Sequence, residues 1–240
     1  YDRFDLFLDL RISFNNTFLS VGKVVIDDEQ ALWIPTSGGL CKYKNGMFSQ
    51  IGEKQALTQS IVPYDQTHLF VTYKDSIRLL NMNTLEQKSV CEINNTFQIS
   101  SLFYDNKREV LWVGTSTDGL FYLDMQKKTL LPFSDFPKQP IGVITESSDS
   151  TLLVGIDGQG VWELDKDKKK VLNILKEDID NPFSLRGDGV YDIYCDGQKR
   201  VWVTTYTGGL SFFDWKSPLI NQITHQVNNP NSLGNDNVNK

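Results

Sequence analysis

The sequence of 240 residues has few of the side chains from which catalytic and metal sites are commonly built. It contains two histidines, His68 and His225, and neither has a ligand or nucleophile partner at a recognisable spacing. It has no HExxH, GxSxG, Walker or dinucleotide fingerprint, since the GIDGQG stretch falls at an expected hairpin rather than before a helix. We therefore expect no catalytic residue, no bound metal and no cofactor in this segment.

Cysteine is also scarce. Cys41, Cys91 and Cys195 are an odd number without paired spacing, and none lies beside a histidine in a metal-binding pattern. We interpret the three side chains as buried thiols, with a disulfide between two of them as the alternative.

Long apolar runs and an excess of positive charge are both missing. No stretch of eighteen apolar residues occurs, so we expect no membrane span, and the basic and apolar blocks of a signal peptide are expected outside this segment. The net charge of -6 disfavours nucleic acid as a partner, since phosphate binding needs a basic face. The one dense basic run, DKDKKKV at residues 165–171, is interrupted by acids and predicts a solvated turn rather than contact with a membrane.

Helical signals are nearly absent, and a repeat takes their place. Five similar stretches are centred on Trp33, Phe70, Trp112, Leu153 and Trp202, at spacings of 37, 42, 41 and 49 residues. Each holds β-rich segments separated by polar turns and, in most copies, a glycine turn. Four strands in each period of about forty residues predict an all-β fold, a β-propeller of four-stranded blades.

Residues 1–240 are predicted to form one propeller segment with about five blades, which we expect to be part of a seven-bladed propeller. The predicted blades lie near residues 17–57, 58–97, 98–139, 140–183 and 184–228. The ending NNPNSLGNDNV aligns without a gap with DNPFSLRGDGV, 48 residues upstream, so residues 229–240 are predicted to start a further blade.

Two residue types recur at equivalent positions of the repeat. We expect the tryptophans to pack between blades rather than to stack on sugar or base, because a periodic aromatic is typical of a core: Trp33, Trp112 and Trp202. We expect the aspartates of the preceding turns to accept backbone N–H bonds and to have a structural role: Asp27, Asp105 and Asp196.

The stretches LWVGTSTDGLFYLD, VWVTTYTGGLSFFD and NNPNSLGNDNV resemble the repeats of the two-component regulator propellers. WD40 propellers are excluded, since no Gly-His opens and no Trp-Asp closes a blade. The resemblance covers nearly the whole chain and is weakest around Phe70, where VTYKDSIRLLN lacks the glycine turn. It implies the periplasmic sensor region of a hybrid histidine kinase from Bacteroidetes, in which further propeller sequence, an immunoglobulin-like domain, a membrane helix and the kinase lie outside this segment.

The topology of a propeller predicts where a ligand binds. The loop that enters the first strand of a blade and the turn between its second and third strands emerge on one face. The variable polar residues of this face are the predicted ligand-binding residues: Tyr73, Lys74, Thr117, Asp118, Asp157, Gln159, Tyr206 and Thr207 from the turns, with Arg186 and Asp188 from an entry loop. Aromatic rings beside hydroxyl, amide and charged groups are what an oligosaccharide requires.

The sequence thus favours a non-catalytic sensory module that binds a glycan-derived oligosaccharide and controls polysaccharide utilisation. Two alternatives stay open: a propeller lyase or glycosidase, and a protein-interaction scaffold. The expected partners are an oligosaccharide, the rest of the same ectodomain and a second copy in a homodimer, with neither nucleic acid nor membrane.

Overall fold

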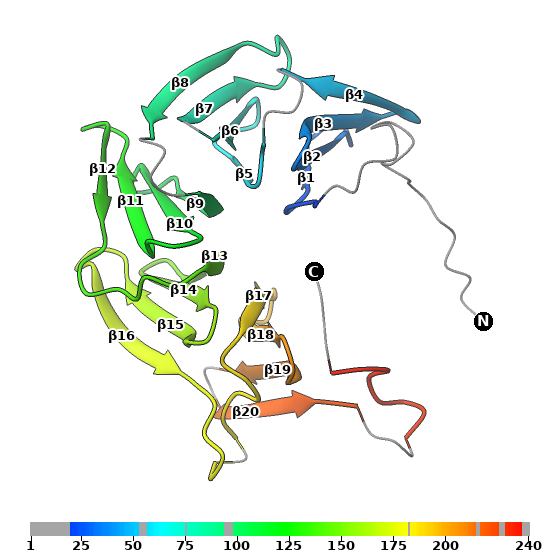
Figure 1. Cartoon of the computed structure of the whole chain (residues 1–240), viewed down its shortest axis with the longest axis vertical. Coiled ribbons are helices and arrows are strands. Elements are labelled where there is room, and N and C mark those ends of the chain that lie inside the picture. The colour runs from blue at the N-terminus through cyan, green and yellow to red at the C-terminus, as the bar shows by residue number, and fades with distance from the viewer. Residues whose placement is uncertain are drawn as a thin grey trace. The chain divides into compact units, whose positions relative to one another are not determined.

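The computed structural model describes residues 20–52, 57–74, 76–93, 98–181, 183–214, 217–225 and 229–236. The chain divides into two compact units, Tyr1–Thr96 and Phe97–Lys240, which we describe separately. All regular elements in the described residues are β-strands, grouped in five four-stranded sheets that we call blades 1 to 5 in chain order (Figure 1). No helix with the length and apolar character of a membrane span occurs in the described ranges.

The first unit contains blades 1 and 2, each an antiparallel meander in which every strand pairs with the next along the chain. Blade 1 consists of β1 (Val25–Ile26), β2 (Leu32–Thr36), β3 (Gly39–Lys44) and β4 (Met47–Ile51). Blade 2 consists of β5 (Ile61–Pro63), β6 (His68–Thr72), β7 (Ser76–Asn81) and β8 (Gln87–Glu92).

The second unit contains blades 3, 4 and 5, built in the same way. Blade 3 consists of β9 (Ile99–Asp105), β10 (Val110–Thr115), β11 (Leu120–Asp124) and β12 (Thr129–Pro132). Blade 4 consists of β13 (Ile141–Ser148), β14 (Thr151–Ile156), β15 (Gly160–Asp165) and β16 (Lys170–Leu175). Blade 5 consists of β17 (Val190–Cys195), β18 (Arg200–Thr205), β19 (Gly209–Asp214) and β20 (Ser217–Ile223).

The first strands of blades 3, 4 and 5 contact one another, β13 lying between β9 and β17. Meanders of four strands whose first strands are neighbours are the blades of a β-propeller, so the predicted fold class is confirmed. A complete ring of seven blades stays a prediction.

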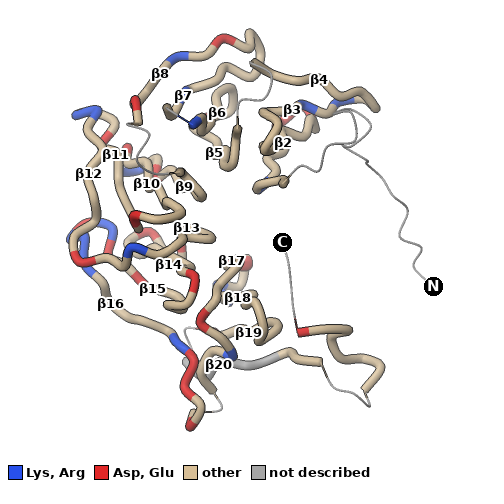
Figure 2. The backbone as a smooth tube through the Cα atoms, viewed as in Figure 1, with Lys and Arg blue, Asp and Glu red and all other residues tan. Residues whose placement is uncertain are grey.

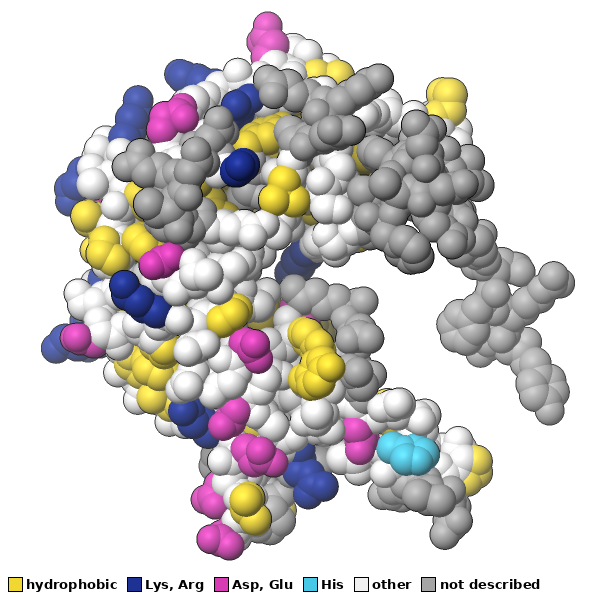
Figure 3. Space-filling view, in the orientation of Figure 1, with side chains coloured by type: hydrophobic (Ala, Val, Ile, Leu, Met, Phe, Trp, Pro, Cys, Tyr) yellow, Lys and Arg dark blue, Asp and Glu magenta, His cyan; other side chains and the backbone are white. Residues whose placement is uncertain are grey.

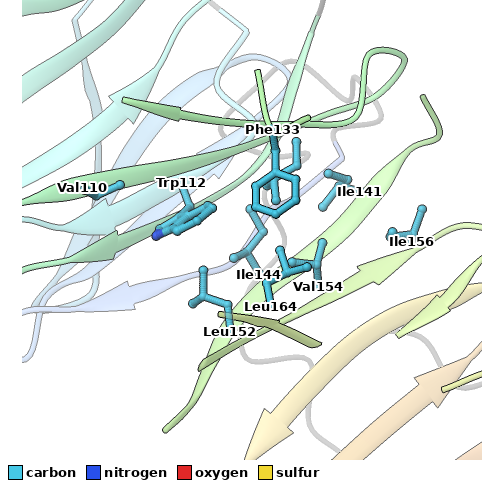
Figure 4. Packing of buried hydrophobic residues seen from close by; sticks show 10 residues of the cluster. Val110, Trp112, Phe133, Ile141, Ile144, Leu152, Val154, Ile156 and Leu164 are labelled. Carbon is cyan, nitrogen blue, oxygen red and sulfur yellow. The ribbon is translucent and has the colours of Figure 1, made fainter. Parts of the chain in front are cut away.

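The aromatic position of the repeat lies on the second strand of each blade, and in blades 1 and 3 it packs against the following blade. Trp33 on β2 packs in one buried cluster with Ile61 and Leu69 of blade 2. Trp112 on β10 packs with Ile144 and Leu152 of blade 4 (Figure 4). The predicted packing between blades is therefore confirmed for both tryptophans.

Trp202 differs from the other two tryptophans. Its ring is half-buried and stacks on Phe212 of its own blade, with ring centroids 4.8 Å apart. No following blade is present in the described residues, and Tyr194 on the neighbouring strand is largely exposed. The prediction that Trp202 packs between blades is thus not met in the described part of the chain.

The turn aspartates have the structural role predicted for them, together with a bond that the sequence did not reveal. Asp27 Oδ1 accepts the backbone N–H of Ala31 at 2.8 Å, and Asp27 Oδ2 accepts the indole N–H of Trp33 at 2.8 Å. Asp196 binds Arg200 N and the Trp202 indole in the same way, at 2.9 and 3.0 Å. One carboxylate therefore closes the turn and fixes the aromatic ring that follows it.

The basic run at residues 165–171 is not the solvated turn that we predicted. Lys166 is fully buried, its Nζ lying 3.3 Å from Asp105 Oδ2 and also paired with Glu146. Lys169 places its Nζ 4.7 Å from the centre of the Trp112 ring. Two lysines of this run thus join blade 4 to blade 3.

The three thiols are free, but only Cys41 is buried as predicted. Cys91 and Cys195 are half-buried, so for these two the prediction is wrong. Burial raises the pKa of Cys41 and of Cys195 to about 11.

Candidate functional site

A pocket of about 390 Å³ opens between blades 4 and 5, where β13 and β17 begin. Its lining comes from the entry to each of these strands and from the turns after β14 and β18: Pro140, Ile141, Gly142, Asp157, Gly189, Val190, Tyr191 and Tyr206. These are the entry loops and the turns between second and third strands that the topology predicted to share one face. The pocket lies wholly within the second unit.

A β-bulge at the start of each first strand shapes this pocket. The pairing of β17 with β18 passes from Val190↔Thr205 to Asp192↔Thr204, which leaves Tyr191 as the extra residue. The pairing of β13 with β14 omits Gly142 in the same way. Because a bulge turns its extra side chain out of the regular alternation, Tyr191 contributes its ring to the pocket instead of the packed blade.

Tyr191 and Tyr206 form an aromatic pair in the pocket wall. Their ring centroids lie 5.6 Å apart at an interplanar angle of 58°. Tyr206 is largely exposed, on the turn that follows β18. Burial raises the pKa of Tyr191, and nearby Tyr206 and Asp157 add to the shift, which places all three polar groups in one neighbourhood.

Asp157 provides the carboxylate of the pocket. Its backbone N–H donates to Pro140 O at 2.9 Å, which holds the turn after β14 against the entry to β13. Its side chain makes no hydrogen bond or ion pair with the residues that the structure describes, unlike Asp27 and Asp196. The carboxylate is therefore available to a ligand.

Gly189 leaves the space between Asp157 and Tyr206 open. A Cβ at this position would lie 3.3 Å from Asp157 Oδ1 and 3.5 Å from Tyr206 Cβ. Its φ lies outside the left-handed region, so the backbone accepts other residues there. A side chain longer than alanine at position 189 would project into the pocket.

Of the ten predicted ligand-binding residues, the structure places two in the pocket wall, Asp157 and Tyr206. Asp188 Oδ1 instead accepts the backbone N–H of Glu177 at 2.7 Å, and Gln159 Oε1 accepts Lys176 Nζ at 2.8 Å. Arg186 and Thr207 are exposed outside the lining.

The other four predicted residues lie in blades 2 and 3. In the turn after β10, Thr117 Oγ1 donates to Asp118 Oδ2 at 2.7 Å. In the first unit, Tyr73 is buried beneath the Arg78 guanidinium, 4.6 Å from its ring centre, and Lys74 is exposed. A ligand role for these residues stays a prediction.

Sequence reasoning missed Tyr191 because it belongs to the start of a strand rather than to a turn, and it missed Gly189 of the entry loop because glycine has no side chain to contribute. The signal was present, since Tyr191 aligns with Gly142 and Ser100, the extra residues of the bulges in blades 4 and 3. Ser100 Oγ donates to Ile141 O at 2.7 Å and so ties adjacent blades together. Tyr191 of blade 5 is thus an aromatic residue at a position where blades 3 and 4 have a small one.

The described residues contain no group of three or more His, Cys, Asp or Glu side chains that could hold a metal ion.

Comparison with known proteins finds one family repeat in the chain. Residues 184–207, which span the entry loop and the first two strands of blade 5, match the model of the two component regulator propeller family. None of the curated proteins matches the chain.

Several solved structures share the fold. Two describe the extracellular domain of BT4673 from B. thetaiotaomicron, named once as a one component and once as a hybrid two component system, at 17% identity and TM-scores of 0.59 and 0.57. Each alignment covers 91% of this chain and 35% of that domain. Another structure is the extracellular domain of the hybrid two component system BT3049 from B. thetaiotaomicron. It is 16% identical to this chain with a TM-score of 0.57, and the alignment covers 90% of this chain and 36% of that one.

A third protein of B. thetaiotaomicron, of unknown function, gives 9% identity and a TM-score of 0.65, over 86% of this chain and 58% of that one. The chain thus spans about a third of the length of the extracellular domains that it matches. With the family repeat at residues 184–207 and this fold, the resemblance to the two component regulator propellers expected from the sequence is confirmed.

Proposed function

We propose that this propeller segment is the ligand-binding part of an extracytoplasmic sensor, and that the pocket between blades 4 and 5 binds an oligosaccharide without changing it. One observation supports this proposal most strongly. The rings of Tyr191 and Tyr206 line the same pocket as the Asp157 carboxylate, which makes no hydrogen bond or ion pair with the described residues. The similar solved structures support the sensory role, since their names describe extracellular domains of signalling systems. We also propose a periplasmic location, which the same likeness supports.

The chemistry of the pocket suits a sugar. The C–H face of a pyranose packs on an aromatic ring, and its hydroxyl groups donate to a carboxylate. Tyr191 and Tyr206 offer two tilted ring faces, and Asp157 offers an acceptor beside them. A pocket of about 390 Å³ matches a short segment of a glycan rather than a long chain.

The same pocket argues for binding rather than cleavage. Most glycoside hydrolases need a pair of carboxylates flanking the scissile bond. Among the lining residues, Asp157 is the one with a carboxylate. We therefore expect a bound oligosaccharide to be recovered unaltered, which chromatography before and after incubation will show.

Filling the pocket is expected to abolish binding. The variant Gly189→Leu places a side chain between Asp157 and Tyr206, and we expect the affinity for a bound oligosaccharide to fall at least about 100-fold because the site is occupied. Tyr191→Ala is expected to weaken binding by about 1 kcal/mol through loss of one ring face. Titration calorimetry of the parent against a panel of short plant and host oligosaccharides selects the probe.

The matched control is Gly197→Leu. Gly197 lies in the turn between β17 and β18, where a Cβ meets nothing within 4 Å, so its replacement is expected to leave binding unchanged. Equal binding by the Gly189→Leu variant, or a cleaved product from the parent, would refute the proposed site or its non-catalytic role.

A further inference from the structure

The outermost strand of blade 4 has an unusual surface for an edge strand. β16 pairs with β15 on one side and with no other described strand. Val171, Leu172 and Ile174 are all exposed along it, and Ile179 and Phe183 are exposed in the loop that follows. Figure 3 shows hydrophobic side chains along this side of the blade.

Other outer strands are better protected. The described outer strands β4 and β12 expose one large apolar side chain each, Met47 and Leu131, and β8 exposes none. Ile179, with 95% of its surface accessible, is the most exposed large hydrophobic side chain of the described residues. A cluster of this kind on an edge strand is typical of an interaction surface.

The two ends of β16 carry opposite charge. Lys168, Lys169 and Lys170 lie at its start and outnumber Asp165 and Asp167, whereas Lys176 at its end is outnumbered by Glu177, Asp178 and Asp180 (Figure 2). Lys170 and Glu177 form no ion pair with any residue in the described ranges, and both are exposed. A surface with a basic end, an apolar centre and an acidic end is complementary to itself when one copy is reversed.

We propose that β16 and the loop after it form a homodimer contact, in which two copies of this chain lie antiparallel across a two-fold axis. An axis between Asn173 and Ile174 sets Lys170 of each copy opposite Glu177 of the other and brings the apolar centres together. Two-fold contacts of this kind use the same patch on both copies. The opposed charges fix the antiparallel direction, because a parallel arrangement would set lysine against lysine.

The contact is made by side chains rather than by a continuous sheet. Leu172 is the extra residue of a bulge, since the pairing passes from Glu163↔Asn173 to Leu164↔Val171. The Asn173 side-chain oxygen accepts the backbone N–H of Ile174 at 2.9 Å. Both features prevent the addition of another strand at this edge. The surface is small, so we expect a weak dimer with a Kd of about 1–100 μM.

Charge exchange tests the contact directly. Sedimentation velocity of the whole 240-residue chain over a concentration series is expected to show a monomer–dimer equilibrium. Lys170→Glu and Glu177→Lys are each expected to raise the dimer Kd at least about tenfold, since each change makes both ends of the contact repulsive. An equimolar mixture of the two variants is expected to restore dimers, because each glutamate then meets a lysine.

The control variant is Lys199→Glu, which makes the same charge change on an exposed residue of the turn before β18 and is expected to leave the dimer Kd unchanged. Thermal unfolding that matches the parent confirms that the variants fold. A monomeric parent at millimolar concentration would overturn the proposal. Parent-like dimers of either single variant, or a mixture that stays monomeric, would overturn it equally, since association would then occur elsewhere or not at all.

Discussion

Replacement of Trp112 with alanine is expected to lower the free energy of unfolding by about 3–5 kcal/mol. The ring is completely buried between blades 3 and 4, against Phe133 of its own blade and Leu152 and Ile144 of the next. Its removal leaves a cavity that rigid β-strands on both sides fill poorly. Urea unfolding followed by tyrosine fluorescence and circular dichroism measures the loss.

Trp202→Ala is the matched control. The two tryptophans occupy equivalent positions, but Trp202 is half-buried and packs mainly on Phe212. We expect a loss of about 1–2 kcal/mol, because less apolar surface is re-exposed. Equal losses for the two variants would contradict the conclusion that the equivalent position is buried by the following blade.

Replacement of Lys166 with methionine is expected to cost about 3 kcal/mol, although the change exchanges a charged residue for an apolar one. Lys166 has no exposed surface, and its ammonium group lies between the carboxylates of Asp105 and Glu146. Asp105 is itself buried, and after the substitution it keeps the pair with Arg108 Nη1 at 3.1 Å as compensation. The negative charge of buried Asp105 is then only partly balanced, which destabilises the folded state.

Two further variants separate this cause from a general effect of removing a lysine. Lys168→Met changes an exposed side chain paired with Asp165 at 3.7 Å, and it is expected to alter the free energy of unfolding by about 0.5 kcal/mol at most. Asp105→Asn in the Lys166→Met background is expected to recover part of the loss, since it removes the unbalanced charge. A double variant less stable than Lys166→Met alone would contradict this explanation.

The blades were predictable from the sequence because their signals are local and repeat. The same pattern recurs around Trp33, Trp112 and Trp202: alternating apolar residues, polar turns and an aromatic residue on the second strand. Strands are found where this pattern predicts them. The same locality explains the correct structural role of Asp27 and Asp196, whose backbone bonds reach at most four residues along the chain.

The polar contacts around Trp112 were not predictable, although its packing between blades was, because they depend on one inserted residue and on a distant lysine. Asp27 and Asp196 precede their tryptophans by six residues, whereas Asp105 precedes Trp112 by seven. Asp105 pairs with Lys166 and Arg108 instead, and the buried Trp112 indole N–H makes no hydrogen bond with the described residues. Composition alone indicated a solvated turn for a run that in fact inserts Lys166 between two blades.

The sequence predicted the face of the propeller on which the candidate pocket lies, but not most of the residues that line it. Topology placed Asp157 and Tyr206 together correctly, since turns after second strands emerge on one side. Tyr191 escaped because its direction depends on a bulge, which changes the alternation of a strand by one residue and shows in the sequence only when Tyr191 is aligned with Gly142 and Ser100.

The most direct test of the proposed sensor site is a crystal structure of this chain with an oligosaccharide selected by calorimetry. We predict density for sugar between the rings of Tyr191 and Tyr206, with a hydroxyl group within hydrogen-bond distance of the Asp157 carboxylate and every glycosidic bond intact. Sugar bound at another surface, with the pocket between blades 4 and 5 empty, would contradict the account.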